Sequence, residues 1–484
     1  MGEKDVLAPA EPACVAGDDA HPDLFAFDAA EGLRRRMPEL SARTVITRAQ
    51  IVVLTCTLLA AAAFAARWPQ TAGLTVVALS SLSFFAGMLF RGVLSLLGGA
   101  VAPQPAPSRA PAAALPVYTV LVPLYREANV LPRLARALLL LDYPHDKLDI
   151  KIIVEADDHG TAAVARDLTT RGPFEIVRVP PGEPRTKPRA CNYALHFARG
   201  EFTVIFDAED RPERDQLRKA VVAFRRADDT TACLQARLGF YNTDDGWLPR
   251  LFTLDYYVWF HSLLPGLDRL GVPMPLGGTS NHFRTAVLRE LGGWDPYNVT
   301  EDADLGIRIA QLRKRVSMLD STTFEEAPTR LTAWLKQRSR WLKGYMQTWL
   351  VHTRHPLALW RNVGPGGFFA FHLFVGGAIV SALVNPFLWA IFAGSVLFGW
   401  RFFDGVTGET MLVLCGSGLI GGHAILTGLA VIGPMRRGWG TLAPYGFTVS
   451  LYWALISAAA FRALHQLVFN PHHWDKTEHG ITRR

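Results

Sequence analysis

Two carboxylates stand two residues apart at the end of the apolar segment FTVIFDAED (202–210) of this 484-residue chain. In an extended backbone, residues two apart face the same side, so Asp207 and Glu209 could share one divalent cation. Carboxylate oxygens suit Mg²⁺ or Mn²⁺, and such a cation could bridge to a substrate diphosphate. Asp210 points away unless the chain turns there. The alternative is that the loop is simply solvated, or that Asp210 caps the following helix.

A second acidic pair, Asp157 and Asp158, follows a segment rich in Ile and Val. Its carboxylates could accept hydrogen bonds from a nucleobase N–H and from ribose hydroxyls. Alternatively, the pair caps a helix that begins near Thr161. Lys187 would supply positive charge near a nucleotide, although an isolated loop lysine is commonly just solvated.

A third acidic group, Glu301 and Asp302, follows Thr300 and precedes a helical pattern. An acid here could act as a general base on an attacking hydroxyl. Equally, Thr300 could be an N-cap, with both acids favourably placed in the first turn of the helix. Both readings can hold together, because capping fixes the geometry that a base requires. The nearby glycine-bearing segment PLGGTSNHFR (275–284) could let backbone approach a ligand, or form a plain turn.

The segment QRSRW places three side chains at helical spacing: Gln337, Arg340 and Trp341. On a helix these positions share one face. A sugar ring could stack on Trp341 while Arg340 neutralises a diphosphate leaving group. The alternative is an amphipathic helix at a membrane interface with ordinary Arg and Trp anchors.

These groups need a scaffold that brings them together, and the segment from Pro116 to Arg330 predicts one. Short β-branched runs alternate with helical patterns, which indicates a mostly parallel sheet covered by helices on both faces. Ligands in such sheets bind beyond the carboxyl ends of the strands. The predicted strands are 118–124, 149–158, 174–180 and 202–210, with helices at 128–141, after Thr161 and at 188–199.

The remaining sequence is predominantly apolar. Half of all residues are hydrophobic and only 19% are charged, and the formal net charge is +7, which excludes a disordered or fibrous chain. The five scattered cysteines suggest neither a zinc site nor a disulfide framework. Nearly uncharged stretches at 49–66 and 71–98 predict a transmembrane hairpin within residues 46–100. Arginines 34–36, 43 and 48 would keep residues 1–45, a partly disordered tail, in the cytosol.

Beyond a Pro/Ala linker (101–115) and the domain of 116–330, residues 331–362 predict interfacial helices and residues 363–469 further membrane spans. The apolar stretches 366–384 and 386–402 meet at Asn385 and Pro386, so they form either one kinked helix or a hairpin. We favour the hairpin, which gives four C-terminal spans, six in all and a cytosolic segment at 470–484. Arg436 and Arg437 would then lie outside, against the charge rule.

Together and in this order, these residues resemble the membrane-integrated family 2 glycosyltransferases, whose members include cellulose, hyaluronan, chitin and poly-N-acetylglucosamine synthases. The similarity covers Pro116 to about His352 and the membrane layout. VPLYREANVLPRL resembles the first strand and turn of the family, Asp157 and Asp158 its nucleotide-binding acids, and Asp207 to Glu209 its DxD motif. Thr300 to Asp302 and QRSRW resemble its catalytic-base motif and its QxxRW motif.

The resemblance implies a GT-A fold, Rossmann-like, inserted between transmembrane helices, a nucleotide-sugar donor that is usually UDP-linked, inversion at the anomeric carbon, and Mg²⁺ or Mn²⁺. Carried over, it assigns Asp302 as the base with Glu301 beside it, and the metal to Asp207 and Glu209 or Asp210. The implied nucleotide-binding residues are Pro123, Tyr125, Glu127, Asp157, Asp158, Lys187 and Arg340. The implied acceptor-binding residues are Gly278, Thr279, Ser280, Thr300, Gln337 and Trp341.

The family commonly has Asp where this chain has Glu209, which leaves open whether Glu209 or Asp210 reaches the metal. The C-terminal NPHHWDKTEHG loosely resembles a loop that closes over the nucleotide in several synthases, so Trp474, Lys476 and Thr477 are further nucleotide-binding candidates. The alternative is a membrane-exit segment anchored by Trp474.

Three functions remain open. The first is a processive polysaccharide synthase of a bacterial inner membrane, whose spans form a channel for the polymer and which works with periplasmic or outer-membrane export partners. The second is one-step transfer of a sugar to a membrane lipid. The third is a binding or receptor subunit with a degenerate transferase domain, against which the intact set of candidate residues argues. The sequence gives no indication of a nucleic-acid partner and does not identify the sugar, the linkage or the acceptor.

Overall fold

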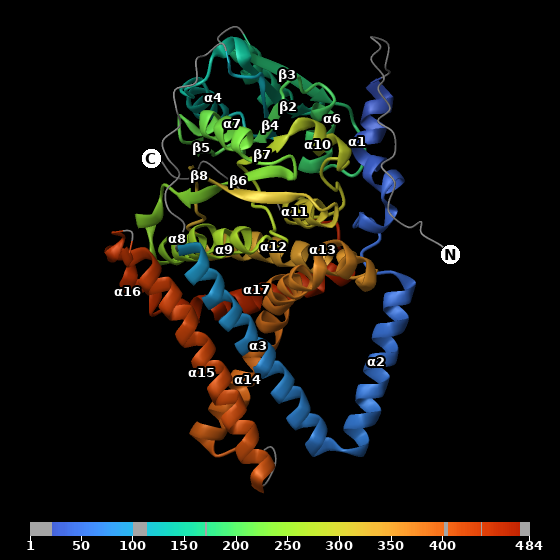
Figure 1. Ribbon diagram of the computed structural model, residues 1–484, viewed down its shortest axis with the longest axis vertical. Coiled ribbons are helices and arrows are strands. Elements are labelled where there is room, and N and C mark those ends of the chain that lie inside the picture. The colour runs from blue at the N-terminus through green and yellow to red at the C-terminus, as the bar shows by residue number, and fades with distance from the viewer. Residues whose placement is uncertain (1–21, 100–113, 170–171, 401–404, 437, 475–484) are drawn as a thin grey trace.

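The computed structural model describes residues 22–99, 114–169, 172–400, 405–436 and 438–474. A sheet domain lies above a set of long helices (Figure 1). The strands are β1 (Tyr118–Leu124), β2 (Leu148–Glu155), β3 (Phe174–Val179), β4 (Phe202–Ile205), β5 (Arg211–Pro212), β6 (Thr231–Phe240), β7 (Asn281–Arg284) and β8 (Arg315–Glu325). The main helices of this domain are α4 (Leu131–Leu139), α5 (His159–Thr169), α6 (Lys187–Leu195), α7 (Gln216–Arg226), α8 (Trp247–Val258), α9 (Leu264–Leu270), α10 (Thr285–Glu290) and α11 (Glu301–Gln311), with a π-helical turn, η5 (Trp259–Leu263), between α8 and α9.

The sheet has eight strands in the order β3-β2-β1-β4-β7-β6-β8-β5. The four strands expected from the sequence pair in parallel, as does β6 with β8. However, β7 runs antiparallel to both β4 and β6, and β5 runs antiparallel to β8. The predicted α/β fold is therefore confirmed, but the sheet is mixed. The sequence did not predict β5, β6, β7 and β8, because three of these four strands are short or lie among motif residues.

Apolar residues cover both faces of the sheet, which explains why its central strands carry little polar sequence. Along β1, Val120 and Val122 face one core, which α4, α5 and α7 cover, while Leu121 faces the other. The second core contains α6, α8 and α9 and continues without a break into α12 and α17. The sheet domain and the helices beneath it thus share one hydrophobic core.

Long apolar helices extend away from the sheet domain (Figure 1). They are α2 (Arg48–Arg67), α3 (Pro69–Gly99), α13 (Pro356–Phe371) continued through η6 (His372–Gly376) into α14 (Gly377–Phe398), and α15 (Gly405–Arg436). Counting the α13–α14 unit once, these are four helices long and apolar enough to cross a membrane, among the residues described. α2 buries no residue, as expected for a helix that faces lipid. The predicted N-terminal pair of apolar helices is therefore present.

The last long helix, α17 (Val449–Phe469), follows α16 (Ala443–Gly446) after a bend of 62°. Just before it begins, the Thr448 hydroxyl accepts a hydrogen bond from Trp247 Nε1 of the sheet domain. Just after it ends, the backbone of Asn470 and His473 accepts hydrogen bonds from Lys343. α17 therefore runs along the underside of the domain, beneath α12 (Leu331–His352), rather than away from it (Figure 1).

The predicted hairpin at Asn385 and Pro386 is wrong, because α14 continues through both residues. Pro386 removes one helical hydrogen bond, but contacts of α14 with α3, α15 and α17 on either side keep the helix intact. The described C-terminal region thus holds two helices long and apolar enough to cross a membrane, and the bent pair Gly440–Gly446 and Val449–Phe469 passes the same test if taken as one unit, which is fewer than the predicted four. With this arrangement Arg436 lies at the end of α15 that contacts α8, on the side of the sheet domain, which removes the conflict with the charge rule. Arg437 lies outside the described residues.

The N-terminal segment is more ordered than a tail. Helix α1 (Pro22–Arg36) packs on α6, and Ala29 and Leu33 are buried there. Further along, the backbone N–H of Ala42 donates to Asp295 over 2.5 Å. The described part of the predicted tail, residues 22–45, is therefore docked on the sheet domain. Residues 1–21 and most of the 101–115 linker lie outside the described residues.

Two glycines allow α3 and the sheet domain to pack closely against each other. A Cβ on Gly98 would collide with the backbone oxygen of Ser262, and one on Gly266 would collide with the backbone of Leu94. Such a close approach leaves no room for a side chain, so the position requires glycine.

We expect Gly98→Ala to destabilise the protein by about 1–3 kcal/mol through overpacking of this contact. Gly99→Ala is the matched control, because a Cβ there meets no atom within 4 Å. Thermal unfolding in detergent should show a lower melting temperature for the Gly98 variant only. Equal melting temperatures for the two variants would contradict this packing.

Candidate functional site

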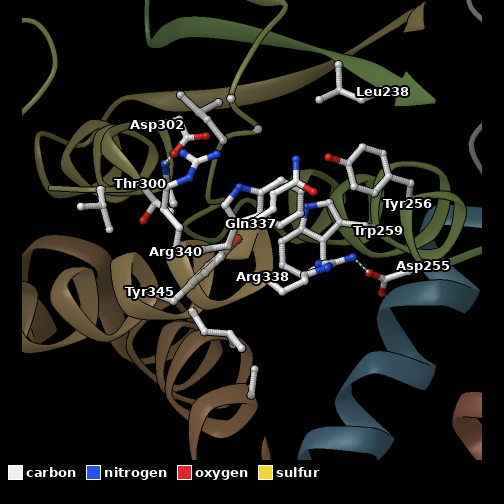
Figure 2. A pocket seen from close by; sticks show the side chains of 18 of the residues that line it. Leu238, Asp255, Tyr256, Trp259, Thr300, Asp302, Gln337, Arg338, Arg340 and Tyr345 are labelled. Carbon is white, nitrogen blue, oxygen red and sulfur yellow. Dashed lines mark hydrogen bonds and ion pairs between the residues drawn. The ribbon is translucent and has the colours of Figure 1, made fainter. Parts of the chain in front are cut away.

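A cavity of about 240 Å³ lies where the sheet domain meets the helices beneath it. Its upper part is lined by residues from the loop after β4, from the end of β8 and from the start of α11. Its middle is lined by α8, η5 and α12, and its lower part by α3, η6, α14 and α17. Figure 2 shows Asp302 and Arg340 facing the same space as Gln337, Tyr256 and Trp259. The cavity thus connects the carboxyl edge of the sheet with the level of the apolar helices.

Asp207 and Glu209 line the cavity, as the sequence suggested, although not within a strand. β4 ends at Ile205, and the chain then turns, with the N–H of Asp210 donating to the backbone oxygen of Asp207 over 3.2 Å. This turn sends Asp210 inward, where it is 1% exposed. Asp210 Oδ2 accepts from the N–H of Asp207 over 2.7 Å and from the Thr279 hydroxyl. Asp210 therefore shapes the acidic turn from beneath, and the structure does not bring it into the cavity.

Glu325, at the end of β8, is a fourth acid of this cluster that the sequence analysis missed. Burial raises its pKa well above the ordinary value, and so do the nearby Asp210, Glu209 and Asp207. The pKa of Asp210 is raised likewise by burial, by Asp207 and by Glu209. Repulsion among these carboxylates is what a divalent cation would relieve. Among the described residues no three such ligands converge closely enough to hold a metal by themselves, so part of the coordination would come from a bound substrate.

Lys187 is the basic side chain paired with this acidic cluster. Its Nζ donates to Asp207 Oδ1 over 2.5 Å and to the backbone oxygen of Gly278 over 3.0 Å. Burial alone would lower its pKa, but Asp207 and Glu301 raise it above the ordinary value. Lys187 is therefore a fixed positive charge at the mouth of the cavity, where an anionic ligand could displace Asp207 as its partner.

Glu301 and Asp302 open helix α11 and both line the cavity. Burial and the charge of Asp302 raise the pKa of Glu301 to about 8, so Glu301 carries a proton at neutral pH. Burial also raises the pKa of Asp302, while Lys187 and Arg340 oppose the shift. Asp302 Oδ1 accepts from the N–H of Ala303 over 2.7 Å, which fixes the carboxylate at the helix start. A raised pKa makes the Asp302 carboxylate a stronger proton acceptor than an ordinary exposed one, which suits it as a base.

The start of α11 is held in place by α12. A Cβ on Gly344 would collide with the side chain of Thr300, so glycine allows the two elements to meet. Gln347 of α12 accepts from the N–H of Val299 over 3.0 Å. Thr300 lines the cavity and immediately precedes α11, but its side chain makes no capping hydrogen bond. Thr300 therefore occupies the predicted N-cap position, but its side chain does not cap α11.

The face of α12 that bears Gln337, Arg340 and Trp341 points into the cavity, as expected from the spacing (Figure 2). Gln337 is 9% exposed, and its Oε1 has no hydrogen-bond partner among the described residues. The Arg340 guanidinium is buried within electrostatic range of Glu301, Asp302 and Asp207. Trp341 stacks at 6.1 Å on Tyr256 of α8. The face thus offers an amide, a cation and an aromatic platform to a ligand.

The C-terminal segment returns to this helix and covers Arg340. The guanidinium carbon of Arg340 lies 4.6 Å from the ring centre of Trp474, which also lines the cavity. Lys343 Nζ donates to the backbone oxygen of His473 over 2.6 Å, and Gln347 donates to that of Pro471 over 3.0 Å. The predicted placement of Trp474 near the site is supported, whereas Lys476 and Thr477 lie outside the described residues.

The candidates at the ends of β1 and β2 lie outside the cavity lining, on the same sheet edge. Arg185 forms an ion pair with Asp157 and lies over the ring of Tyr125 at 4.5 Å. Asp158 is 7% exposed and accepts from the N–H of Arg126 over 2.5 Å and from that of Thr161 over 3.1 Å. Asp158 therefore caps α5, as the alternative reading held, and Tyr125 and Asp157 are joined by their shared contact with Arg185. Glu127 follows in the same turn, and its backbone N–H donates to the Thr161 hydroxyl over 3.1 Å. Pro123 is within β1.

Of the glycine-bearing segment 275–284, Leu276, Gly277 and Gly278 line the cavity. Thr279 and Ser280, by contrast, are buried beneath it. Thr279 donates to Ile205 over 3.1 Å, and Ser280 Oγ donates to Thr323 over 2.7 Å. The predicted acceptor-binding role therefore narrows to the backbone at Gly278, while the two hydroxyls support the acidic turn and β8.

Comparisons with known proteins are consistent with this geometry. Residues 116–344 match the protein family described as "Glycosyltransferase like family 2". The chain is 24% identical over 233 residues to "Probable glycosyltransferase YdaM" of Bacillus subtilis, which covers 48% of this chain and 55% of that protein. It is 28% identical over 246 residues to "Beta-monoglucosyldiacylglycerol synthase" of Synechocystis, covering 49% and 50%. It is also 28% identical over 243 residues to "Glucomannan 4-beta-mannosyltransferase 2" of Arabidopsis thaliana, covering 47% and 44%.

This chain therefore spans about half the length of the curated relatives it matches. Among solved structures, it superposes on the mannosyltransferase PcManGT of Pyrobaculum calidifontis, in complex with GDP-Man and Mn²⁺, with a TM-score of 0.52. That match has 20% identity and covers 82% of this chain and 99% of that structure, so it supports the fold.

We expect Lys343→Met to loosen the C-terminal segment, because Lys343 is fully buried and its ammonium holds two backbone oxygens of residues 470–473. Hydrogen exchange measured by mass spectrometry should show faster exchange of residues 470–474. Lys336→Met is the matched control, because Lys336 is exposed on the same helix. Unchanged exchange in the Lys343 variant would contradict the proposed tie.

Proposed function

We propose that this chain, whose residues 116–344 match the family described as "Glycosyltransferase like family 2", transfers a sugar from a nucleoside diphosphate sugar to a lipid acceptor. The acceptor enters the cavity from the membrane side and meets the donor beside Asp302. This is the second of the functions that the sequence left open.

The observation that carries the proposal is the composition of the lower cavity wall. Below α12 the lining side chains are apolar except for Arg91: Phe374, Val375, Ala378, Ile379, Trp453 and Ile456. Aliphatic walls at this depth suit an acyl or isoprenoid chain, because burial of apolar surface is favourable. A sugar chain would leave its hydroxyls without hydrogen-bond partners against such walls.

In the proposed reaction, an acceptor hydroxyl oxygen attacks the anomeric carbon of the donor. The bond from that carbon to the diphosphate oxygen breaks, and the electron pair leaves with the diphosphate. The hydroxyl proton passes to Asp302, which is held at the start of α11. Lys187 and Arg340 stabilise the charge that develops on the leaving group. A single displacement of this kind inverts the anomeric configuration.

Mg²⁺ or Mn²⁺ fits the acidic turn. Asp207 and Glu209 would hold the cation together with the donor diphosphate, and Glu325 adds negative charge beside them. The bound cation would neutralise charge on the leaving diphosphate. At the neighbouring strand ends, Tyr125 and Asp157 are the candidates for the nucleoside, which the family resemblance suggests is uridine.

A second candidate is the processive polysaccharide synthase. The rings of Tyr256, Trp259 and Trp341 around the middle of the cavity favour it, because aromatic faces stack on sugar rings. Translocation of the product and export partners belong to this candidate. The similarity to glucomannan mannosyltransferases also favours it, while that to glucosyldiacylglycerol synthases favours the lipid acceptor.

We further propose a bacterial inner membrane as the location, with the sheet domain in the cytosol. The basic residues Arg34 to Arg36, Arg43 and Arg436 lie on the side of the sheet domain. The positive-inside rule then supports this orientation.

The direct test is to incubate the purified protein with a panel of nucleotide sugars, Mg²⁺ or Mn²⁺, and membrane lipids, and to determine the size of the product. We expect a single glycolipid. Asp302→Asn should lower its rate by about 10²–10⁴-fold, because the base is lost. Asp229→Asn, at an exposed position, is the matched control. A ladder of long glycans would support the second candidate instead, and wild-type turnover in the Asp302 variant would refute the base assignment.

The protonated Glu301 predicts a pH effect on donor binding. Above pH about 8 Glu301 loses its proton, and the new negative charge should repel the donor diphosphate, so the KM for the donor should rise. Glu301→Gln cannot ionise, and its donor KM should stay flat over the same pH range. Glu290→Gln, exposed on α10, should keep the wild-type rise. A parallel rise in wild type and Glu301→Gln would show that another group is responsible.

A further inference from the structure

An arginine lies in the apolar part of the cavity. Arg91 belongs to α3, between stretches without charged residues, and it is 6% exposed. Its side chain lines the cavity at the level of Phe374, whose ring centre is 5.3 Å from the guanidinium carbon. A charge at this depth is costly unless it is paired.

Arg91 has no such pairing within the part of the chain that the structure describes. No carboxylate there lies within 4.0 Å of it, and no hydrogen bond of its guanidinium is found. The nearest acid in electrostatic range is Asp255 of α8, which already forms an ion pair with Arg338 (Figure 2). Arg338 also donates to the hydroxyl of Tyr452 over 2.7 Å. Two guanidinium groups thus share one carboxylate, which leaves one positive charge.

The contact with the Phe374 ring does not neutralise this charge. A cation over an aromatic face gains less free energy than a buried charge loses when it has no ionic partner, because the remaining charge is uncompensated. The described residues around Arg91 therefore supply no anion to pair with its guanidinium.

The surroundings define which anion would fit. Val375, Ala378 and Ile379 line the same part of the cavity. A small free anion would leave these apolar walls uncovered, whereas a lipid with an anionic headgroup covers the walls with its chain and neutralises Arg91. Tyr345 of α12 also lines this cavity and is within electrostatic range of both Arg91 and Asp302, so the two groups face one continuous space.

We propose that Arg91 binds the phosphate of an anionic acceptor lipid, a glycerophospholipid whose headgroup also carries a free hydroxyl. This inference rests on the proposed lipid glycosylation and specifies its acceptor. The phosphate binds at Arg91, the acyl chains lie against α14 and α17, and the headgroup hydroxyl reaches Asp302. Arg91 determines acceptor specificity and takes no part in bond formation.

The test uses the full chain in nanodiscs and has two arms. In the first, native mass spectrometry compares the binding of phosphatidylglycerol with that of diacylglycerol. Wild type should prefer the anionic lipid by about tenfold or more, as expected for a charge-assisted contact. Arg91→Gln should bring this ratio close to one, and Arg91→Lys should recover part of it. Arg67→Gln, at the far end of α2, should keep the wild-type ratio.

The second arm measures transfer from the donor to the same two lipids. We expect the KM of phosphatidylglycerol to rise about tenfold or more in Arg91→Gln, with a much smaller change in kcat. Soluble glycerophosphate should be a poor acceptor, because it lacks the chain.

A wild type that binds both lipids equally, or an Arg91→Gln variant that keeps the preference, would overturn the assignment of Arg91. Preferential binding without any transfer to either lipid would instead refute the proposed function, since the binding arm does not require catalysis. If Arg91→Gln and Arg91→Lys lose the binding of both lipids to the same extent, the role of Arg91 is purely structural.

Discussion

The close approach of α12 to the start of α11, at Gly344 and Thr300, fixes the rest of the site. It places Asp302 and the cavity face of α12 on opposite sides of one space, so that a base and a leaving-group cation can act on the same ligand. The other side of α12 packs on α17. Residues of α17, α3 and α14 line the lower part of the cavity. One helix therefore connects the chemistry at the sheet edge with the apolar region below it.

The two ends of the cavity carry opposite, incompletely balanced charge. At the upper end Asp207, Glu209 and Glu325 lie together with Lys187 and Arg340, where a divalent cation and a diphosphate would add one further charged group of each sign. At the lower end Arg91 lacks a partner among the described residues. A donor held by cation and arginine above, and an anionic lipid held by arginine below, would satisfy both ends and bring their reactive groups to Asp302. The electrostatics thus favour two different ligands meeting in the middle.

Much of the fold and of the site could be predicted, and the exceptions have physical causes. β1 matches its prediction in full, because buried parallel strands form continuous apolar runs. Residue type alone does not distinguish Asp158 from Asp157 or Asp210 from Asp207. The local turns decide which carboxylate of each pair can face a ligand. Pro386 looked like a break, but packing on three helices overrides the local preference. Glu325 lies far from every motif, whereas Arg91 was a visible signal: a single charge within an apolar stretch.

The central claim, that a lipid acceptor occupies the lower cavity, is tested most directly by photocrosslinking. A phosphatidylglycerol analogue with a diazirine in its acyl chain would be incorporated into nanodiscs with the protein, irradiated, and its adducts located by mass spectrometry. If a lipid acceptor occupies the lower cavity, adducts should form at the buried cavity residues Ile379 and Ile456, and excess unlabelled phosphatidylglycerol should reduce them. Adducts confined to outward-facing positions on the same two helices, such as Val396 and Leu451, would contradict it.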